Sequence, residues 1–225
     1  IAFDGTGAGT DGTIWGGEFL IAGLADFERA AHLRTWALPG GAASVRDARR
    51  NAFALLSELG LLEHPGAAGL LGTLDEQTRS VTATMIERGI NSPRTSSMGR
   101  LSDAAAAILG ICGKATYEGE PAIELEAAAW RALDGKPVRL DGNHTGVFTS
   151  ADDSPILDPQ PLIEALLNGI VAGVPADRLA LGFHIAITHA TTHIACEICD
   201  REGLDTVALS GGVFMNRLLL QLLTH

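Results

Sequence analysis

The sequence has few cysteines, few basic residues and no long apolar run, and each of these shortages excludes a class of protein. Its three cysteines, Cys112, Cys196 and Cys199, are sparse and odd in number, unlike the paired framework of a secreted disulfide-stapled domain. No apolar run approaches the roughly 20 residues that span a bilayer, and the N-terminal segment has no signal-peptide pattern. We therefore expect a cytoplasmic protein with no membrane-spanning segment.

Acidic residues outnumber basic ones. Asp and Glu number 27 against 16 Lys and Arg, which gives a formal net charge of −11. Because this balance repels a phosphate backbone, nucleic acid is not expected as a partner. The apolar fraction of 46% is enough for a core, and the length suits one layered α/β domain or two tightly joined lobes. The sequence starts without a methionine and stops inside a predicted helix, so we expect a piece of a longer protein.

The apolar pattern predicts an N-terminal hairpin followed mainly by helices. Glycine and threonine over residues 3–17 predict a strand, a tight turn and a second strand. Helical spacing predicts helices over 45–62, 73–89, 101–110, 124–133, 162–171 and 176–199. The last of these is apolar on more than one face, so we expect it to be central and buried. A loop with one or two short strands is expected at 134–154, and a buried strand at 206–209 before a turn and a helix over 213–223.

Two glycine-rich segments lie near the two ends of the chain. Ser210-Gly211-Gly212 precedes the last predicted helix, whose N-terminus presents unpaired N–H groups to an anion. The first segment, over 5–17, offers a second surface of backbone N–H groups and threonine hydroxyls. Neither has the pattern of a P-loop or of a Rossmann unit. Together they favour two lobes of an actin-like fold facing a nucleotide, although a Ser-Gly-Gly alone is also typical of a simple turn.

Two carboxylates, Asp4 and Asp11, lie inside the first glycine-rich segment. A carboxylate beside a bound phosphate has to meet a cation or a hydroxyl group. The pattern therefore indicates a metal ion near this segment. The alternative is that one of the two carboxylates only caps a turn.

Longer motifs follow one another along the chain. The main ones are Phe3-Asp4-Gly5-Thr6-Gly7, Gly9-Thr10-Asp11-Gly12-Thr13-Ile14-Trp15-Gly16-Gly17-Glu18 and Leu209-Ser210-Gly211-Gly212-Val213-Phe214-Met215-Asn216-Arg217, with shorter ones at 38–41, 95–101, 117–119, 124–126 and 183–184. In this order they resemble the HypF carbamoyltransferases of [NiFe]-hydrogenase maturation, over nearly the whole chain. The sequence is similar, more distantly, to the threonylcarbamoyltransferases that modify tRNA.

The resemblance implies a fold and a reaction. The fold is a partial two-lobed domain of the acetate kinase, sugar kinase, Hsp70 and actin (ASKHA) type over residues 1–225. In the reaction, a YrdC-like domain makes carbamoyl-adenylate from carbamoyl phosphate and ATP with Mg²⁺. The domain over residues 1–225 then passes the carbamoyl group to the C-terminal cysteine thiolate of HypE, for the cyanide ligand of the hydrogenase. The acylphosphatase, zinc-finger and YrdC-like domains are implied to lie outside this chain.

Residue by residue, the resemblance also implies a binding site. Asp4 matches a metal-ligating aspartate of an Fe or Zn site, whose two histidines and second aspartate are implied to lie outside this chain. The implied nucleotide contacts are Gly12, Thr13, Gly16 and Gly17 in a first phosphate loop, Asp103 on the ribose hydroxyls, Gly119 and Glu124 beside the nucleoside, and Gly211, Gly212 and Asn216 in a second loop. The alternatives are that Asp103 caps the alanine-rich helix and that Glu124 belongs to a solvated first turn. Ala8 and Ser102 depart from the family, which usually has Tyr and Phe there.

Two other functions are open. The first is threonylcarbamoyl transfer to tRNA, against which the acidic balance and the loop Thr10-Asp11-Gly12-Thr13-Ile14-Trp15 argue. The second is a nucleotide-dependent binding module without catalysis, on the same fold.

A helical run of histidines and cysteines offers a separate metal hypothesis. His189, His193, Cys196 and Cys199 are spaced by four, three and three residues, so they share a helix face. A zinc or iron site is one interpretation of that spacing. We favour ordinary core packing, because single cysteines and histidines on an apolar helix are usually buried.

Overall fold

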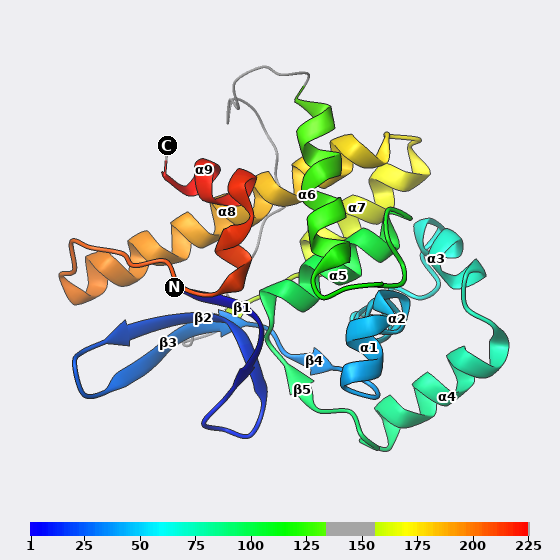
Figure 1. Ribbon diagram of the computed structural model, residues 1–225, viewed down its shortest axis with the longest axis horizontal. Helices are drawn as coiled ribbons and strands as arrows, with labels where there is room; N and C mark the ends of the chain where they lie inside the picture. Colours follow the sequence, from blue (N-terminus) through cyan, green and yellow to red (C-terminus); the bar gives the residue numbers. More distant parts are fainter. Residues whose placement is uncertain (134–155, 225) are drawn as a thin grey trace.

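The computed structural model of the protein describes residues 1–133 and 156–224, and Figure 1 shows a small sheet bordered by helices. The strands are β1 (Ala2–Ala8), β2 (Ile14–Ala22), β3 (Phe27–Leu33), β4 (Trp36–Ala37), β5 (Arg94–Thr95) and β6 (Ile156–Leu157). The helices are α1 (Ala42–Arg46), α2 (Ala48–Glu58), η1 (Pro65–Ala67), α3 (Ala68–Gly72), α4 (Glu76–Glu87), α5 (Met98–Ile108), α6 (Glu120–Ala132), α7 (Gln160–Val171), α8 (Ala176–Glu202), η2 (Gly212–Met215) and α9 (Arg217–Thr224). The expected mixed α/β class is confirmed.

The sheet is built on the N-terminal hairpin. Its order is β4-β5-β2-β3-β6, and β1 pairs with β2 outside this path. β1, β2 and β3 pair antiparallel in succession, whereas β5 and β6 join β2 and β3 in parallel. The hairpin expected over 3–17 is thereby confirmed. The two-residue strands β4, β5 and β6 are too short for a periodic signal, so sequence reasoning missed them.

A bulge interrupts β1 in its middle. Phe3 pairs with Gly17 and Gly7 pairs with Trp15, so three residues of β1 face one residue of β2. The Ser97 hydroxyl, at the N-terminus of α5, lies 2.7 Å from the carbonyl oxygens of both Asp4 and Gly5. The bulge therefore turns the backbone of residues 4–6 away from β2 and toward α5.

A buried carboxylate holds the second strand of this hairpin. Glu18 is 1% exposed, and its Oε2 accepts the N–H groups of Gly16 at 2.5 Å and of Gly17 at 2.7 Å. Its Oε1 accepts from Arg29 Nη2 at 2.9 Å and from the Ser96 hydroxyl. Because four donors surround it, the charge of Glu18 is compensated inside the fold.

The turn of the hairpin is closed by Asp11. Its Oδ1 accepts from the Thr13 hydroxyl at 2.7 Å and from the Trp15 indole at 2.9 Å, and its Oδ2 pairs with Arg29 at 3.0 Å. The Thr13 hydroxyl, helped by the Trp15 N–H and the Arg29 charge, lowers the pKa of Asp11 to about 2. The guanidinium of Arg29 also stacks 4.2 Å from the Trp15 ring centroid. Asp11 thus has the turn-stabilising role that the sequence left open as an alternative.

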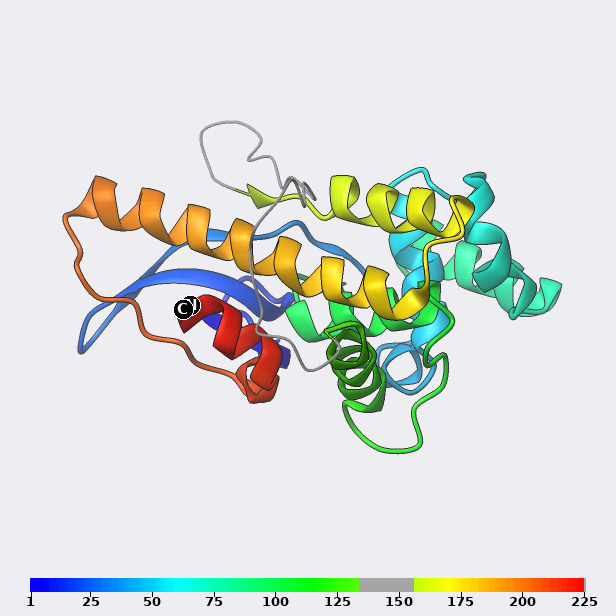
Figure 2. The ribbon, with the colours of Figure 1, turned by 90° about the horizontal axis from the view of Figure 1, so that it is seen from above.

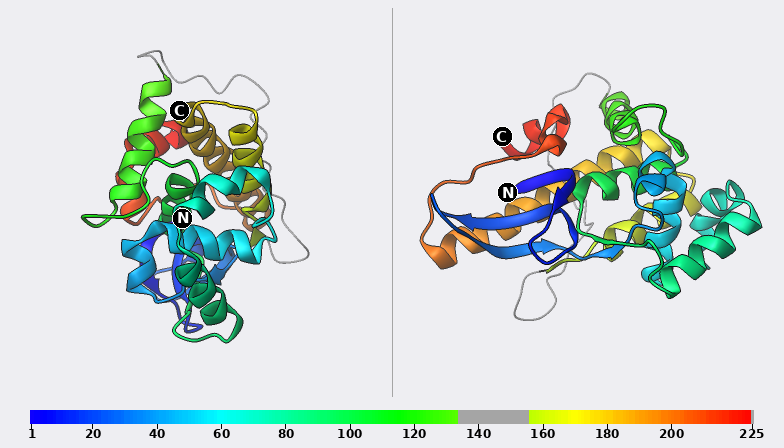
Figure 3. Two further views of the ribbon diagram at one scale, coloured as in Figure 1. Left: turned by 90° about the vertical axis from the view of Figure 1, so that its right-hand side faces the viewer. Right: turned by 60° about the horizontal axis from the view of Figure 1, so that its bottom comes forward.

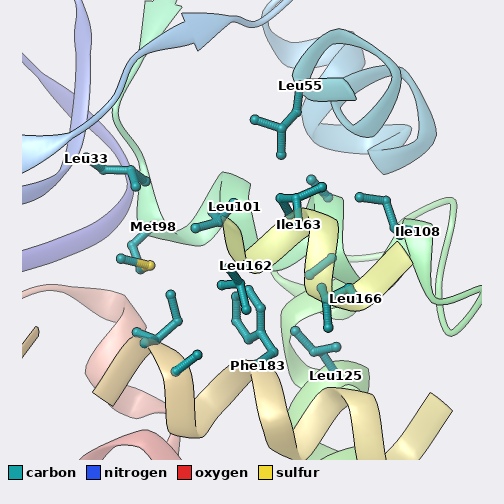
Figure 4. Close-up of a cluster of buried hydrophobic side chains, with 14 of the residues drawn as sticks. Leu33, Leu55, Met98, Leu101, Ile108, Leu125, Leu162, Ile163, Leu166 and Phe183 are labelled. Carbon is teal, nitrogen blue, oxygen red and sulfur yellow. The ribbon is translucent and has the colours of Figure 1, made fainter. Parts of the chain in front are cut away.

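The helices pack around α5. This alanine-rich helix lies between α2 and α6, and α6 packs in turn on α8. Small side chains allow these close approaches, since Ala104, Ala105 and Ala106 are fully buried. Figure 2 shows α7 running beside the first half of α8, and Figure 3 shows α4 at the end of the molecule away from the β2–β3 turn. The core residues of Figure 4 come from β3, α2, α5, α6, α7 and α8, which makes one continuous core.

Three sequence-based expectations need correction. The helix expected over 45–62 is broken at Asp47, whose side chain accepts the Arg49 N–H and so caps α2 as a separate helix. The helix expected over 213–223 is split at Asn216, which has extended backbone between η2 and α9. Residues 206–209 form no buried strand: only Ser210 bridges β1, at Ala2, and 206–208 are exposed because no described segment covers their outer face. The strands expected within 134–154 lie outside the described residues.

The long helix α8 is central over only half its length. Residues 183–188 are buried, but His189, His193 and Cys196 are exposed and Cys199 is half-buried. The core-packing interpretation of these four residues is therefore wrong for the exposed ones, because the face that meets the body there carries Ala190, Thr191, Ile194 and Ile198. Among residues 1–133 and 156–224, no three His, Cys, Asp or Glu side chains gather as a metal site, and no helix is long and apolar enough to cross a membrane.

The close contact between β2 and the segment before α5 yields a stability test. A Cβ on Gly17 would lie 2.2 Å from the Ser96 carbonyl oxygen, so Gly17→Ala forces β2 and this segment apart. We expect a loss of about 2–4 kcal/mol in the free energy of unfolding, measured by urea denaturation. The matched control is Gly69→Ala on α3, where a Cβ meets nothing within 4 Å and a helical alanine stabilises by about 0.5–1 kcal/mol. Equal effects of the two changes would contradict the packing role of Gly17.

Candidate functional site

The two ends of the described chain meet at β1. The Phe3 N–H donates to the Ser210 carbonyl at 2.9 Å, and the Ser210 N–H donates to the Ile1 carbonyl at 2.9 Å. Gly211 follows with a φ of 101°, and a Cβ there would lie 2.1 Å from the Phe3 carbonyl oxygen. The chain can pass β1 this closely only with glycine at this position.

A cavity of about 380 Å³ opens beside this crossing. Asp4 of β1, the first turns of α5 and α6, and the η2 segment line it, and Figure 1 shows these elements converging near the centre of the molecule. Of the predicted site residues, the structure brings Asp4, Gly119, Gly212 and Asn216 to the cavity wall. Gly211 lies just behind it, packed on Phe3.

Asp4 stands at the mouth of the cavity because the bulge turns it outward. Its side chain is exposed, and its Oδ1 accepts the N–H of Gly5 at 2.7 Å. A Cβ on Gly212 would lie 3.3 Å from the same Oδ1, so η2 passes directly over the carboxylate. As a metal ligand Asp4 stands alone, since no cluster of three candidate ligands occurs in the described residues. The described side chains therefore do not form a metal site by themselves.

The opposite wall is the N-terminus of α6. Gly119 caps it with a φ of 78°. The N–H groups of its first turn are used within the protein, since Glu120 donates to the Tyr117 carbonyl, Ile123 to the Gly119 carbonyl and Ala122 to Asp103. One turn further, Glu126 Oε1 accepts the N–H of Arg217 at 2.9 Å and of Leu218 at 3.2 Å. Glu126 thus caps α9 from α6 and fixes the wall against the η2 segment.

A histidine buried in α8 fixes Asn216. His184 Nδ1 lies 2.7 Å from the Ala180 carbonyl, and its Nε2 lies 2.9 Å from Asn216 Nδ2. The carbonyl can only accept and the amide NH₂ can only donate, so the geometry requires the neutral Nδ1–H tautomer. Burial, against a smaller opposite effect of Glu126, lowers the pKa of His184 and favours this form. Asn216 Oδ1 in turn accepts the Leu219 N–H at 2.9 Å and caps α9.

Asp103 lies beneath the cavity wall. Its side chain is 0% exposed, and its Oδ2 pairs with Arg100 Nη2 at 3.0 Å. Burial raises the pKa of Asp103 to about 6, against the opposing effects of the Arg100 charge and the Ala122 N–H. Arg100 lines the cavity and Asp103 does not. In this arrangement the carboxylate faces a guanidinium, so a direct contact with ribose hydroxyls would require α6 or Arg100 to move.

The remaining predicted residues lie away from the cavity. Gly12 and Thr13 are at the tip of the hairpin, where the Thr13 hydroxyl is used by Asp11. The N–H groups of Gly16 and Gly17 already donate to Glu18. Glu124 is half-buried on another side of α6 and does not line the cavity. The first glycine-rich segment therefore does not form one phosphate loop here, because its glycines serve turn geometry and close strand packing.

Arg100, Glu126 and His184 were given no role from the sequence, although each lies in a recognised motif. Their partners are Asp103, the first N–H groups of α9, and Asn216. Two of these three contacts join residues from distant parts of the chain, so no local spacing could indicate them. For Arg100, the three-residue spacing to Asp103 was a usable signal, because these positions share a helix face.

The chain matches one known protein family and several of its members. Residues 1–225 match the family described as carbamoyltransferase, Kae1-like domain, second subdomain. The carbamoyltransferase HypF homolog of Cupriavidus necator is 39% identical over 225 residues, which cover 97% of this chain and 55% of that protein. Carbamoyltransferase HypF of Rhodobacter capsulatus is 36% identical over 96% of this chain and 26% of its own length. The chain thus spans about half or less of these relatives.

Solved structures give the same result. The crystal structure of full-length HypF in the phosphate- and nucleotide-bound form superposes with a TM-score of 0.88 at 30% identity, over 100% of this chain and 34% of that one. The T. kodakarensis HypF structure gives a TM-score of 0.79 at 34% identity, over 99% of this chain and 29% of that one. The expected ASKHA-type fold, as part of a larger domain, is confirmed.

The Asp103 carboxyl should make stability depend on pH. Its folded pKa of about 6 lies above the ordinary value of 3.8, so the folded state binds the extra proton between about pH 4 and 6. Wild type therefore loses stability from this group as pH rises through that window. Asp103→Asn cannot ionise at this position. Its free energy of unfolding, relative to that of wild type, should therefore rise by about 1–3 kcal/mol between pH 4 and pH 7. Urea titrations at each pH measure it, and a difference that stays constant with pH would contradict the raised pKa.

The His184–Asn216 contact gives a second expectation. His184→Leu leaves the half-buried Asn216 amide without its acceptor and should lower the unfolding free energy by about 1–3 kcal/mol. His184→Gln keeps an acceptor oxygen within reach of Asn216 and should lose less. Exposed His193→Leu, on the same helix, is the control and should stay within about 0.5 kcal/mol of wild type. Leu and Gln variants of equal stability would show that the hydrogen bond contributes nothing.

Proposed function

Because the chain belongs to the HypF carbamoyltransferase family, as the second subdomain of the Kae1-like domain, we propose that it takes part in carbamoyl transfer from carbamoyl-adenylate to a cysteine thiolate. The single observation that carries the proposal is the cavity in which Asp4, Gly119, Gly212 and Asn216 meet. It is supported by a nucleotide-bound HypF structure of the same fold. As in that family, the acceptor is the C-terminal cysteine of HypE and the reaction is cytoplasmic.

In the proposed step, the acceptor sulfur forms a bond to the carbamoyl carbon. The bond from that carbon to the phosphate oxygen breaks, and AMP leaves with the electron pair. The thiolate charge is transferred to the leaving phosphate, so the products are a thiocarbamate and AMP with one more negative charge. The protein's task is to hold the mixed anhydride and to stabilise this charge, by donors that are already in place.

The proposed ligand contacts follow the cavity. Backbone N–H groups around Gly212 lie where a phosphate would be held. Asn216, oriented by His184, offers its remaining amide hydrogen. Gly211, predicted as a nucleotide contact, is proposed as a packing residue of this loop, and Asp103, predicted on the ribose hydroxyls, is proposed to act through Arg100. Gly12, Thr13, Gly16, Gly17 and Glu124 contribute to the proposal only through the folding of the hairpin and of α6.

An Fe or Zn ion and Mg²⁺ belong to the family expectation. Asp4 is the described residue that would ligate the transition metal, which when bound would polarise an oxygen of the ligand. Since the described residues give one such ligand, no step of the mechanism is derived through a metal. Carbamoyl phosphate and ATP would enter through a YrdC-like domain, as a part of the longer protein.

Binding without catalysis is the second candidate function, and a transfer assay separates the two. The chain is titrated calorimetrically with a stable carbamoyl-adenylate analogue and then incubated with carbamoyl-adenylate, supplied by a separate YrdC-like domain, and with HypE. We expect micromolar binding and a mass increase of one carbamoyl group on HypE. HypE with its C-terminal cysteine changed to serine is the control.

Each result has a distinct meaning. Binding with no transfer would support a nucleotide-binding module and contradict transfer by this chain. Failure of a folded chain to bind the analogue would contradict the proposed site itself. In a parallel assay with threonylcarbamoyl-adenylate and tRNA, transfer to the tRNA with none to HypE would favour the threonylcarbamoyl reaction.

A further inference from the structure

Arg100 carries a buried positive charge that the fold uses only in part. The residue is 5% exposed, and its Nη2 pairs with Asp103 at 3.0 Å. Its Nε and Nη1 are buried and have no hydrogen-bond partner among residues 1–133 and 156–224. Buried polar groups are almost always hydrogen-bonded, since an unused donor loses its hydration without compensation. The unused donors are therefore suited to a partner that is not among these residues.

The position of Arg100 indicates what its unused donors could bind. The residue lies in the first turn of α5 and lines the cavity beside Asp4 and Gly5. A Cβ on Gly5 would come within 3.4 Å of Arg100 Nη2, so the guanidinium lies directly against the β1 bulge. Glycine at position 5 leaves room for this side chain between the bulge and α6.

Arg100 is the group that could contact an anion in a cavity whose other described charged residues are acidic. Among the described residues that line it, Asp4, Glu118 and Glu126 are acidic and Arg100 is the one basic side chain. A negatively charged ligand in such surroundings needs a cation in direct contact. Arg100 can provide it, because a guanidinium presents planar N–H donors to phosphoryl oxygens. Asp103 keeps the guanidinium in place from behind and offsets only part of its charge.

We propose that Arg100 is the phosphate-recognising residue of this cavity, and that Asp103 positions it. This inference rests on the proposed function and makes it more specific. When the bond from the carbamoyl carbon to the phosphate oxygen breaks, the adenylate phosphate gains a negative charge next to Arg100. The same contact would therefore strengthen as AMP leaves, which is the condition for assisting the reaction and not only binding.

The test uses ligands that differ only in the phosphate. Calorimetric affinities of wild type, Arg100→Gln and Arg100→Lys are measured for AMP and for uncharged adenosine. We expect Arg100→Gln to bind AMP at least tenfold more weakly, about 1.4 kcal/mol, and adenosine within about twofold of wild type. Arg100→Lys, which keeps the charge without the planar donors, should lose at least threefold for AMP. Circular dichroism and thermal unfolding report whether each variant folds.

The matched control is Arg50→Gln. Arg50 is half-buried, and like Arg100 it has an Nε that lacks a partner in the described residues, but it contacts Met85 and does not line the cavity. Its AMP affinity should equal that of wild type.

The outcomes separate this inference from the function it rests on. If folded Arg100→Gln and Arg100→Lys bind AMP as well as wild type does, the inference alone is overturned. Equal losses for AMP and adenosine also overturn it, because they indicate a purely structural role. A folded wild type that binds no adenosine nucleotide overturns the inference and the proposed function together. If Arg100→Gln does not fold, the AMP-to-adenosine ratio of Arg100→Lys decides in the same way.

Discussion

The close approach of three chain segments to the backbone of β1 is the constraint on which the rest of the structure depends. Added Cβ atoms on Gly16 and Gly211 would lie 2.4 Å from the Asp4 carbonyl oxygen and 2.1 Å from the Phe3 carbonyl oxygen, and one on Gly99 would lie 2.9 Å from the Gly5 Cα. Side chains cannot be accommodated at such distances. The glycines therefore bring β2, α5 and the η2 segment together at one point, and the cavity lies where they meet.

Charged groups near this point are stabilised in two different ways. Glu18 is surrounded by four donors and has a structural role in the hairpin. Arg100 and Asp103 form a pair in which the guanidinium retains unused donors beside a cavity. A fully compensated charge has nothing left to offer a ligand, whereas a partly compensated one does. This difference separates the structural carboxylate from the residues that we place in the function.

The positions of the predicted site residues illustrate what local patterns can and cannot predict. The glycine-rich turns and the aspartate of β1 were visible because backbone geometry and anion binding have residue-type signatures. Which glycines face a ligand was not visible. The N–H groups of Gly16 and Gly17 donate to the side chain of Glu18. These two hydrogen bonds depend on the backbone path of β2 and not on composition. Likewise, His184 meets Asn216 across 32 positions of sequence.

The sequence by itself determined the mixed α/β class, the hairpin, most of the helices and the membership in a carbamoyltransferase family, because these rest on periodicity and on motifs that are contiguous in the chain. Only the tertiary structure decided which motif residues share a cavity. It placed Asp103 behind Arg100, and it put His189, His193 and Cys196 on an exposed face of α8. The physical reason is that burial and pairing depend on which elements pack together, and long-range packing leaves no local pattern in the chain.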